Sequence, residues 1–164
     1  LGKAQEQLTE QGISWNPDVK IGVMIEIPAL AAIADLVAQE VDFASIGTND
    51  LTQYALAVDR VNPDVSSYYQ SMHPAMLRLL NFAINEFNKA GKDISVCGEM
   101  GGDPVAATAL LGMGIKNLSM GYSSVPMIKK LICNIDMEKA REAVICACKS
   151  RTAEDVKNIL KCVL

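Results

Sequence analysis

The sequence predicts the α/β class, with about four parallel β-strands that alternate with helices as in half of a (β/α)₈ barrel. Short apolar runs of strand length recur four times, and a segment with helical spacing follows each of them. This alternation is typical of a parallel sheet that helices cover on its faces. Four units are too few for a complete barrel, which needs about 250 residues. No G-x-G-x-x-G or P-loop motif indicates a nucleotide-binding sheet.

The expected elements follow one another in a regular order. Strands are predicted at residues 20–25, 41–47, 93–98 and 115–121, and helices after them at 29–40, 48–60, 103–114 and 123–132. A longer amphipathic helix is predicted over 73–92, with Pro74 in its first turn and Gly91 beyond its end. Two more helices are predicted over 136–164, separated near Thr152, which forms a capping-box pattern with Asp155.

Composition limits the classes of function. The chain has 164 residues, of which 50% are hydrophobic, and we expect a single domain over residues 1–164. Its net charge of -4 lacks the basic excess that nucleic-acid binding requires. The apolar stretches are too short to span a membrane, and "LGKAQEQLTEQG" lacks the apolar core of a signal peptide. We therefore expect a cytoplasmic protein with neither nucleic-acid binding nor membrane insertion.

The five cysteines have no disulfide-framework spacing, and we expect them to stay reduced, as in the cytoplasm. Cys146 and Cys148 form a C-x-C pattern that suggests zinc. They lie in a segment with helical spacing, where side chains two positions apart diverge by about 200°. We therefore interpret these two cysteines as ordinary helix residues.

Polar residues gather where the predicted strands end, which is where chemistry collects in parallel α/β folds. Glu26 follows the first strand and Asp50 follows the second. Together they could bind Mg²⁺, which proteins hold through one or two carboxylates. Each has a structural alternative, because Glu26 could pair with a lysine and Asp50 could cap a helix in a capping box with Gln53.

The segment "GTND" offers backbone N–H groups at a helix start, which favours a phosphate or carboxylate. Arg60 could clamp the same anion or be a solvated loop residue. His73 precedes Pro74 at a helix start, where a capping role is favoured over catalysis. Cys97 ends the third strand, and its residue type alone favours a core position over a metal ligand or a nucleophile.

Four stretches in the same order resemble a known family. "GVMIEIPA", "VDFASIGTNDLTQYALAVDR", "VCGEMGGD" and "LLGMGIKNLSM" are similar to the C-terminal part of phosphoenolpyruvate-protein phosphotransferase, Enzyme I of the bacterial sugar phosphotransferase system. The resemblance runs from about Gly12 to the C-terminus. Pyruvate phosphate dikinase and phosphoenolpyruvate synthase share motifs like "GTNDLTQ" and "CGE", but "YALAVDRVNP" is closer to Enzyme I.

The resemblance implies the C-terminal half of a TIM barrel that binds phosphoenolpyruvate (PEP). It implies an enzyme that transfers the phosphoryl group of PEP to a protein histidine and releases pyruvate, for sugar uptake. Matching the motifs assigns Glu26 and Asp50 to Mg²⁺, and Asn49, Asp50 and Arg60 to the substrate. Cys97 would protonate the enolate carbon that becomes the methyl group of pyruvate. Cysteine thiols have an ordinary pKa of about 8.5, so they are mostly protonated near pH 7 and can act as general acids.

The same resemblance sets expectations for partners. Family members bind the phosphocarrier protein through an N-terminal region that carries the phosphorylated histidine, and this chain lacks both, so we expect it to be inactive alone. A half barrel leaves open strand edges, and the family dimerises through this domain, so we expect a homodimer or a higher oligomer. Two alternatives stay open: a fragment of pyruvate phosphate dikinase or PEP synthase, and a dimerisation module without turnover.

Overall fold

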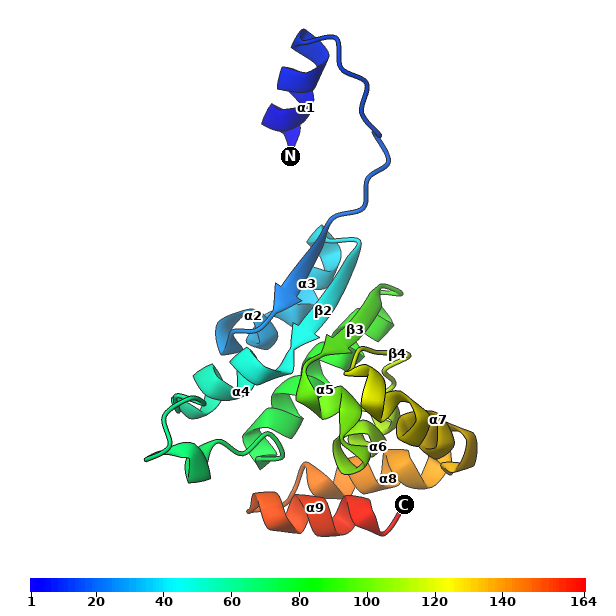
Figure 1. Ribbon diagram of the computed structural model, residues 1–164. Helices are drawn as coiled ribbons and strands as arrows, with labels where there is room; N and C mark the ends of the chain where they lie inside the picture. Colours follow the sequence, from blue (N-terminus) through cyan, green and yellow to red (C-terminus); the bar gives the residue numbers. More distant parts are fainter.

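The computed structural model describes residues 1–164 and contains one sheet of four parallel strands in the order β1-β2-β3-β4. The strands are β1 (Gly22–Ile25), β2 (Phe43–Gly47), β3 (Asp93–Cys97) and β4 (Asn117–Leu118). Helices connect consecutive strands (Figure 1). This confirms the α/β class and the four predicted units, and a parallel sheet in sequential order is what part of a (β/α)₈ barrel contains.

Nine α-helices accompany the sheet, and three short 3₁₀ helices lie in the connections. The α-helices are α1 (Gly2–Glu10), α2 (Pro28–Ala32), α3 (Ala34–Glu40), α4 (Thr48–Leu56), α5 (Pro74–Lys89), α6 (Pro104–Gly112), α7 (Val125–Asn134), α8 (Met137–Ala147) and α9 (Ala153–Lys161). The 3₁₀ helices are η1 (Ser66–Tyr68), η2 (Glu99–Gly102) and η3 (Tyr122–Ser124). None of these helices is both long and apolar enough to cross a bilayer.

The hydrophobic core lies between one face of the sheet and the helices. Alternate strand residues point to this face, and they include the buried side chains of Ile25, Ile46 and Val96. Helix α5 packs its apolar stripe against β3, and α6, which is apolar on all sides, packs against α8 and α9. The opposite face of the sheet is open, and Met24 is 45% exposed there and Phe43 40%.

Three local signals at helix ends are confirmed, at Thr152, His73 and Gly91. The Thr152 hydroxyl accepts a hydrogen bond from the Asp155 backbone N–H at 3.1 Å, so α9 begins where the capping-box pattern predicts. His73 caps α5, because its Nδ1 accepts a hydrogen bond from the Ala75 N–H at 3.2 Å. Gly91 follows α5 with φ +67°, a conformation that glycine adopts without a steric cost.

Several predicted boundaries were wrong. The helix expected over 29–40 is two helices, because the backbone at Ile33 leaves the helical region with φ -117° and ψ 28°. Helix α4 stops at Leu56, where Ala57 turns into the left-handed region, so Arg60 lies in a loop. Strand β4 has only two residues in place of the seven expected over 115–121. Helix α1, which was not predicted, buries none of its residues and lies away from the sheet at the end of an extended segment (Figure 1).

Candidate active site at the strand ends

Strand register brings Glu26 and Cys97 to the same edge of the sheet. Ile25 pairs with Ile46, and Gly47 pairs with Cys97, so Glu26, the next residue after β1, reaches the level of the last pair. A methyl group at Gly47 would lie 3.1 Å from Oε2 of Glu26. The glycine therefore leaves room for the Glu26 carboxylate beside the start of α4.

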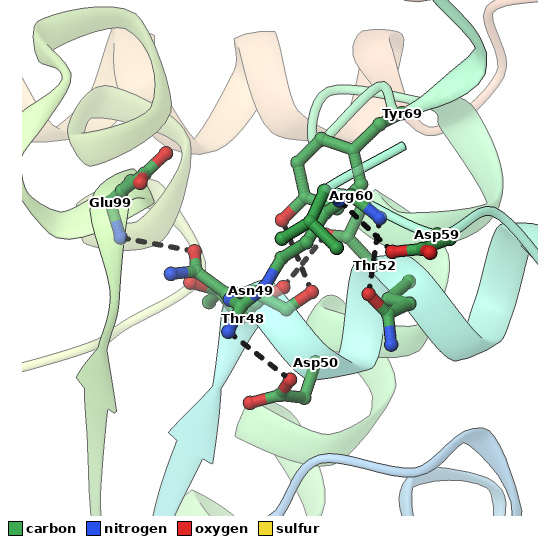
Figure 2. Close-up of polar contacts among 10 residues, drawn as sticks. Thr48, Asn49, Asp50, Thr52, Asp59, Arg60, Tyr69 and Glu99 are labelled. Carbon is green, nitrogen blue, oxygen red and sulfur yellow. Dashed lines mark hydrogen bonds and ion pairs between the residues drawn. The ribbon is translucent and has the colours of Figure 1, made fainter. Parts of the chain in front are cut away.

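Asp50 lies in the first turn of α4, directly beyond this edge. One oxygen of its carboxylate lies 3.7 Å from a guanidinium nitrogen of Arg60, and both side chains are about 40% exposed, Arg60 at 39% and Asp50 at 40% (Figure 2). The helix is capped by Gly47 without a side-chain hydrogen bond, so the alternative that Asp50 caps α4 with Gln53 is wrong. The alternative of a lysine partner for Glu26 also fails, since Glu26 has no ion pair.

The donor set at this edge fits a hard divalent cation. A metal site built from protein side chains alone would require three or more histidine, cysteine or acidic side chains in one place, and the chain has no such group. The C-x-C pair, Cys146 and Cys148, is therefore not part of one. Glu26 and Asp50 supply two carboxylates, both half-buried. Mg²⁺ typically binds to one or two carboxylates and completes its octahedron with water and substrate oxygens.

The end of β3 is hydrogen-bonded to the first turn of α4. The Thr48 hydroxyl donates to the Cys97 carbonyl at 3.0 Å. Oδ1 of Asn49 accepts from the Glu99 N–H at 3.3 Å, as Figure 2 shows. Gly98 lies between them with φ +109°, and a methyl group there would lie 2.5 Å from the Thr48 hydroxyl oxygen. Only glycine fits this close approach, so the "CGE" motif has a direct geometric reason.

The Cys97 thiol faces the open side of the sheet. Its sulfur lies 3.4 Å from the Ile46 carbonyl oxygen and 3.7 Å from the Met24 sulfur. The side chain is half-buried and unbridged, as all five cysteines are free. The interpretation of Cys97 as a core residue is therefore wrong, and its thiol reaches the same edge as the two carboxylates.

The sequence did not single out Tyr69, a central residue of this site. Its hydroxyl donates to the Asn49 carbonyl at 3.1 Å (Figure 2). Burial raises the pKa of the Tyr69 phenol above its ordinary value of 10.0, the Thr52 hydroxyl opposes this rise, and the negative charge of Glu99 adds to it. The signal was invisible in the sequence, because a tyrosine twenty positions beyond Asn49 belongs to no local pattern.

A cavity of about 400 Å³ adjoins Asn49 and Tyr69 on the side of the C-terminal helix. Met72 and Met100 form part of its apolar lining. Lys157 and Lys161, one turn apart on α9, also line it. The C-terminal helix therefore lies close to the polar cluster, although its sequence carries no motif that predicts this.

Of the residues singled out in the sequence, the structure brings Glu26, Asn49, Asp50, Arg60 and Cys97 to one region around the carboxyl ends of β1, β2 and β3. His73 lies outside it and caps α5. Arg60 enters from the loop after α4, and its backbone N–H donates to Oε1 of Gln53 at 3.1 Å. An acidic pair, a cationic fork and a thiol at one edge suit the binding of a small phosphorylated acid and a proton transfer to it.

Comparison with known proteins gives this geometry a family. The model of the PEP-utilising enzyme family's PEP-binding domain matches residues 1–137. The phosphoenolpyruvate-protein phosphotransferase of Haemophilus influenzae is 43% identical over 155 residues, which cover 94% of this chain and 27% of the relative. The phosphoenolpyruvate-protein phosphotransferase of Priestia megaterium is 50% identical over 125 residues, covering 76% of this chain and 22% of the relative. Multiphosphoryl transfer protein 2 of Escherichia coli is 38% identical over 160 residues, covering 98% of this chain and 19% of the relative.

This chain spans between 19% and 27% of the length of these three relatives. The family model covers most of the chain, including every strand of the sheet and every polar residue at the strand ends. The chain therefore belongs to the family of PEP-utilising enzymes, as part of their PEP-binding domain.

Proposed function

We propose that this chain is the PEP- and Mg²⁺-binding part of a phosphoenolpyruvate-protein phosphotransferase, which moves the phosphoryl group of PEP to a protein histidine and releases pyruvate. The observation that carries this proposal is the meeting of Glu26, Asn49, Asp50, Arg60 and Cys97 at one sheet edge of a PEP-binding domain. Relatives with this printed name are 43% and 50% identical to the chain, which favours this reaction over that of a dikinase or a synthase.

Glu26 and Asp50 would hold the Mg²⁺ ion. Bound there, the ion would neutralise part of the negative charge that the phosphate and carboxylate of PEP bring to the site. The Asp50 carboxylate now lies 3.7 Å from the Arg60 guanidinium, a long and half-exposed ion pair. Such a pair contributes little stability. When PEP binds, Asp50 can therefore leave Arg60 and bind the cation, and Arg60 can bind the phosphate.

Arg60 and Asn49 would hold the substrate. The planar guanidinium of Arg60 matches the geometry of a phosphate, and its exposed position in the loop after α4 leaves it free to reach one. The side-chain oxygen of Asn49 accepts a hydrogen bond from the Glu99 N–H at 3.3 Å. The NH₂ group of the Asn49 side chain therefore stays available as a donor. The start of α4 adds the positive end of a helix dipole.

Cys97 would supply the proton. When the phosphorus–oxygen bond of PEP breaks and the phosphoryl group passes to the acceptor histidine, pyruvate enolate remains. The Cys97 S–H would donate its proton to the methylene carbon, giving the methyl group of pyruvate, and the thiolate would regain a proton from solvent. In support, the thiol lies on the open face, where its neighbours, the Ile46 carbonyl and the Met24 sulfur, are weak partners for its proton.

Binding is tested by calorimetric titration of PEP into the chain with and without Mg²⁺. We expect Mg²⁺-dependent heat that Glu26→Gln and Asp50→Asn abolish, because each substitution removes one anionic ligand. Glu40→Gln, at the end of α3, is the matched control and should bind PEP like the parent. Binding that does not require Mg²⁺, or that survives both substitutions, would contradict the proposed site.

The role of Cys97 is tested by exchange of the pyruvate methyl protons for deuterium in D₂O, which is the reverse proton transfer and needs no phosphoryl acceptor. With Mg²⁺ present, we expect the methyl NMR signal to decay, and Cys97→Ala to slow the decay by about 10²- to 10⁴-fold. Cys133→Ala, on the exposed surface of α7, is the control. Equal exchange rates for Cys97→Ala and the parent would refute the assignment.

We further infer that the parent enzyme acts in the cytoplasm, receives its acceptor histidine and phosphocarrier partner through regions outside this chain, and that the isolated chain does not complete the phosphoryl transfer alone. Five free cysteines fit a reducing compartment.

Self-association is part of the proposal, because the open sheet face exposes Met24 and Phe43, and β1 and β4 each have one sheet neighbour. Light scattering should give the mass of a dimer or a larger assembly, and a monomer at all concentrations would contradict it.

A further inference from the structure

The loop over residues 57–73 joins α4 to α5 and carries Arg60. It contains only one short 3₁₀ helix, and nearly all its residues before Tyr69 are exposed. An exposed loop loses conformational freedom when it holds a side chain in place, so its order must come from particular contacts. The backbone N–H of Arg60 donates to Gln53 of α4, which fixes the position of one peptide group but not of the guanidinium.

Tyr69 ties the far part of this loop back to the first turn of α4. Its hydroxyl donates to the Asn49 carbonyl at 3.1 Å, across twenty positions of sequence. The Thr52 hydroxyl and the Arg60 guanidinium lie close enough to this oxygen that each lowers the pKa of the phenol, against the rise that burial causes. Figure 2 shows the ring of Tyr69 above α4, with its hydroxyl turned toward Asn49 and the Arg60 side chain beside it.

The contacts continue from α4 to β3. Thr52 is fully buried and donates its hydroxyl to the Thr48 carbonyl at 2.7 Å. Thr48 is also fully buried, and its hydroxyl donates to the Cys97 carbonyl at 3.0 Å. Through the Asn49 carbonyl, Tyr69 therefore joins the loop to a helix start that is buried and hydrogen-bonded to β3. A phenol hydroxyl held by this carbonyl keeps its place beside the exposed arginine.

We propose that Tyr69 is a positioning residue of the PEP site, which holds the Arg60 guanidinium and the Asn49 peptide in the arrangement that receives the phosphate. This inference rests on the proposed function. Tyr69 makes no chemical step itself and acts through these two residues. Its ring packs in either case, so the hydroxyl alone carries the positioning role.

The test compares Tyr69→Phe with Tyr68→Phe. Phenylalanine keeps the ring and removes the hydroxyl, so the fold should be retained, as circular dichroism can verify. Tyr68 is the adjacent residue and is 66% exposed, which makes it a matched control. We expect Tyr69→Phe to weaken Mg²⁺-dependent PEP binding by about three- to tenfold, the usual effect of one hydrogen bond, and Tyr68→Phe to leave it unchanged.

A coupling experiment separates positioning from general stability. If Tyr69 acts through Arg60, adding Tyr69→Phe to Arg60→Met should weaken PEP binding by less than Tyr69→Phe does in the parent, because one of the two groups it positions is gone. A purely structural role would give the same loss in both backgrounds. Because burial raises the pKa of Tyr69 above 10.0, its hydroxyl stays protonated below pH 9, and the loss in Tyr69→Phe should be equal at pH 6 and pH 9.

Hydrogen exchange of the ligand-free chain tests the loop without PEP. We expect amides of residues 57–68 to exchange faster in Tyr69→Phe than in the parent and in Tyr68→Phe, because the loop is then less firmly held. Unchanged exchange rates in Tyr69→Phe overturn the inference. If exchange rises but the parent chain binds no PEP, the proposed function fails while the anchoring by Tyr69 stands. Additive loss of affinity in the double variant also overturns the inference.

Discussion

The two faces of the β-sheet use the same strands for different purposes. Ile25, Ile46 and Val96 point to the helix-covered face and are 0% exposed. An odd number of positions away on the same strands, Met24 and Phe43 point to the open face and are 45% and 40% exposed, and Cys97 shares that face. Because side chains alternate along a strand, a single residue step separates a core position from a reactive one.

This difference between the two faces predicts which property of the protein a substitution changes. On the covered face, a substitution acts on the free energy of unfolding, because the side chain packs in a closed core. On the open face and its carboxyl edge, a substitution acts on ligand binding or self-association, since water already reaches the side chain. Four substitutions, ordered from the largest expected effect to the smallest, test this division.

Ile46→Ala should have the largest effect on stability. It leaves a cavity in the core beside Val96 and should lower the free energy of unfolding by about 2–5 kcal/mol. Met24→Ala, on the neighbouring strand but on the open face, should lower it by less than about 1.5 kcal/mol, because Met24 is only partly buried. Urea unfolding followed by circular dichroism measures both. Equal losses would mean that the open face is also a closed core.

Gly98→Ala should come second, and it affects the edge at which the two faces meet. Its backbone has φ +109°, and the new methyl group would approach the Thr48 hydroxyl oxygen to 2.5 Å. We expect a loss of about 1–3 kcal/mol of stability, together with weaker PEP binding. Gly91→Ala is the control, as it has φ +67° but nothing within 4 Å of the new methyl group. If both variants lost the same free energy of unfolding and Gly98→Ala still bound PEP, the close approach of residue 98 to the Thr48 hydroxyl would be contradicted.

Phe43→Gln changes the open face alone. Phe43 is 40% exposed and its ring packs over Gly22, so the loss of stability should stay below about 1.5 kcal/mol. We expect the self-association measured by light scattering to weaken, because an apolar contact surface is lost. If the molar mass at a given concentration matches that of the parent, the open face is not where copies of the chain meet.

Asp136→Asn should have the smallest effect, and it acts in the helix layer behind the covered face. Asp136 caps α8, and hydrogen bonds from the backbone N–H groups of Lys139 and Glu138 lower the pKa of its carboxyl below the ordinary value of 3.8. A lowered pKa in the folded state stabilises the fold above pH 3.8, and this contribution is lost as the pH falls further. Thermal unfolding between pH 5 and pH 2.5 should therefore depend less on pH in the variant. Identical pH profiles would contradict the cap.

The parts of the fold that depend on neighbouring residues could be predicted from the sequence. Apolar runs gave the four strands, and Thr152 with Asp155 marked the start of α9, because a cap depends on residues within one turn. The strand-end location of Glu26 and Asp50 also follows, since parallel strands bring their carboxyl ends to one edge. Helix boundaries such as the break at Ile33 could not be predicted, because no glycine or proline lies there.

The contacts that organise the site could not be predicted, because they join residues far apart in the sequence. The Thr48 hydroxyl reaches the carbonyl of Cys97, 49 positions away. Tyr69 reaches Asn49 from a loop without periodic structure. Lys157 lines a cavity with Asn49 although it belongs to the last helix. Such pairings depend on how the units pack, and a single sequence carries no local signal of them.

The most direct test of the account is to map PEP binding on the backbone amides by NMR, which suits a chain of 17.7 kDa. With Mg²⁺ and PEP added, we predict that the largest chemical-shift changes fall at the carboxyl edge, on Glu26, residues 47–50, Arg60 and residues 97–99. The opposite end of the sheet, near Asp42 and Asp93, should stay unchanged. Changes concentrated there, or on the helix-covered face, would contradict the claim that the carboxyl edge is the PEP site.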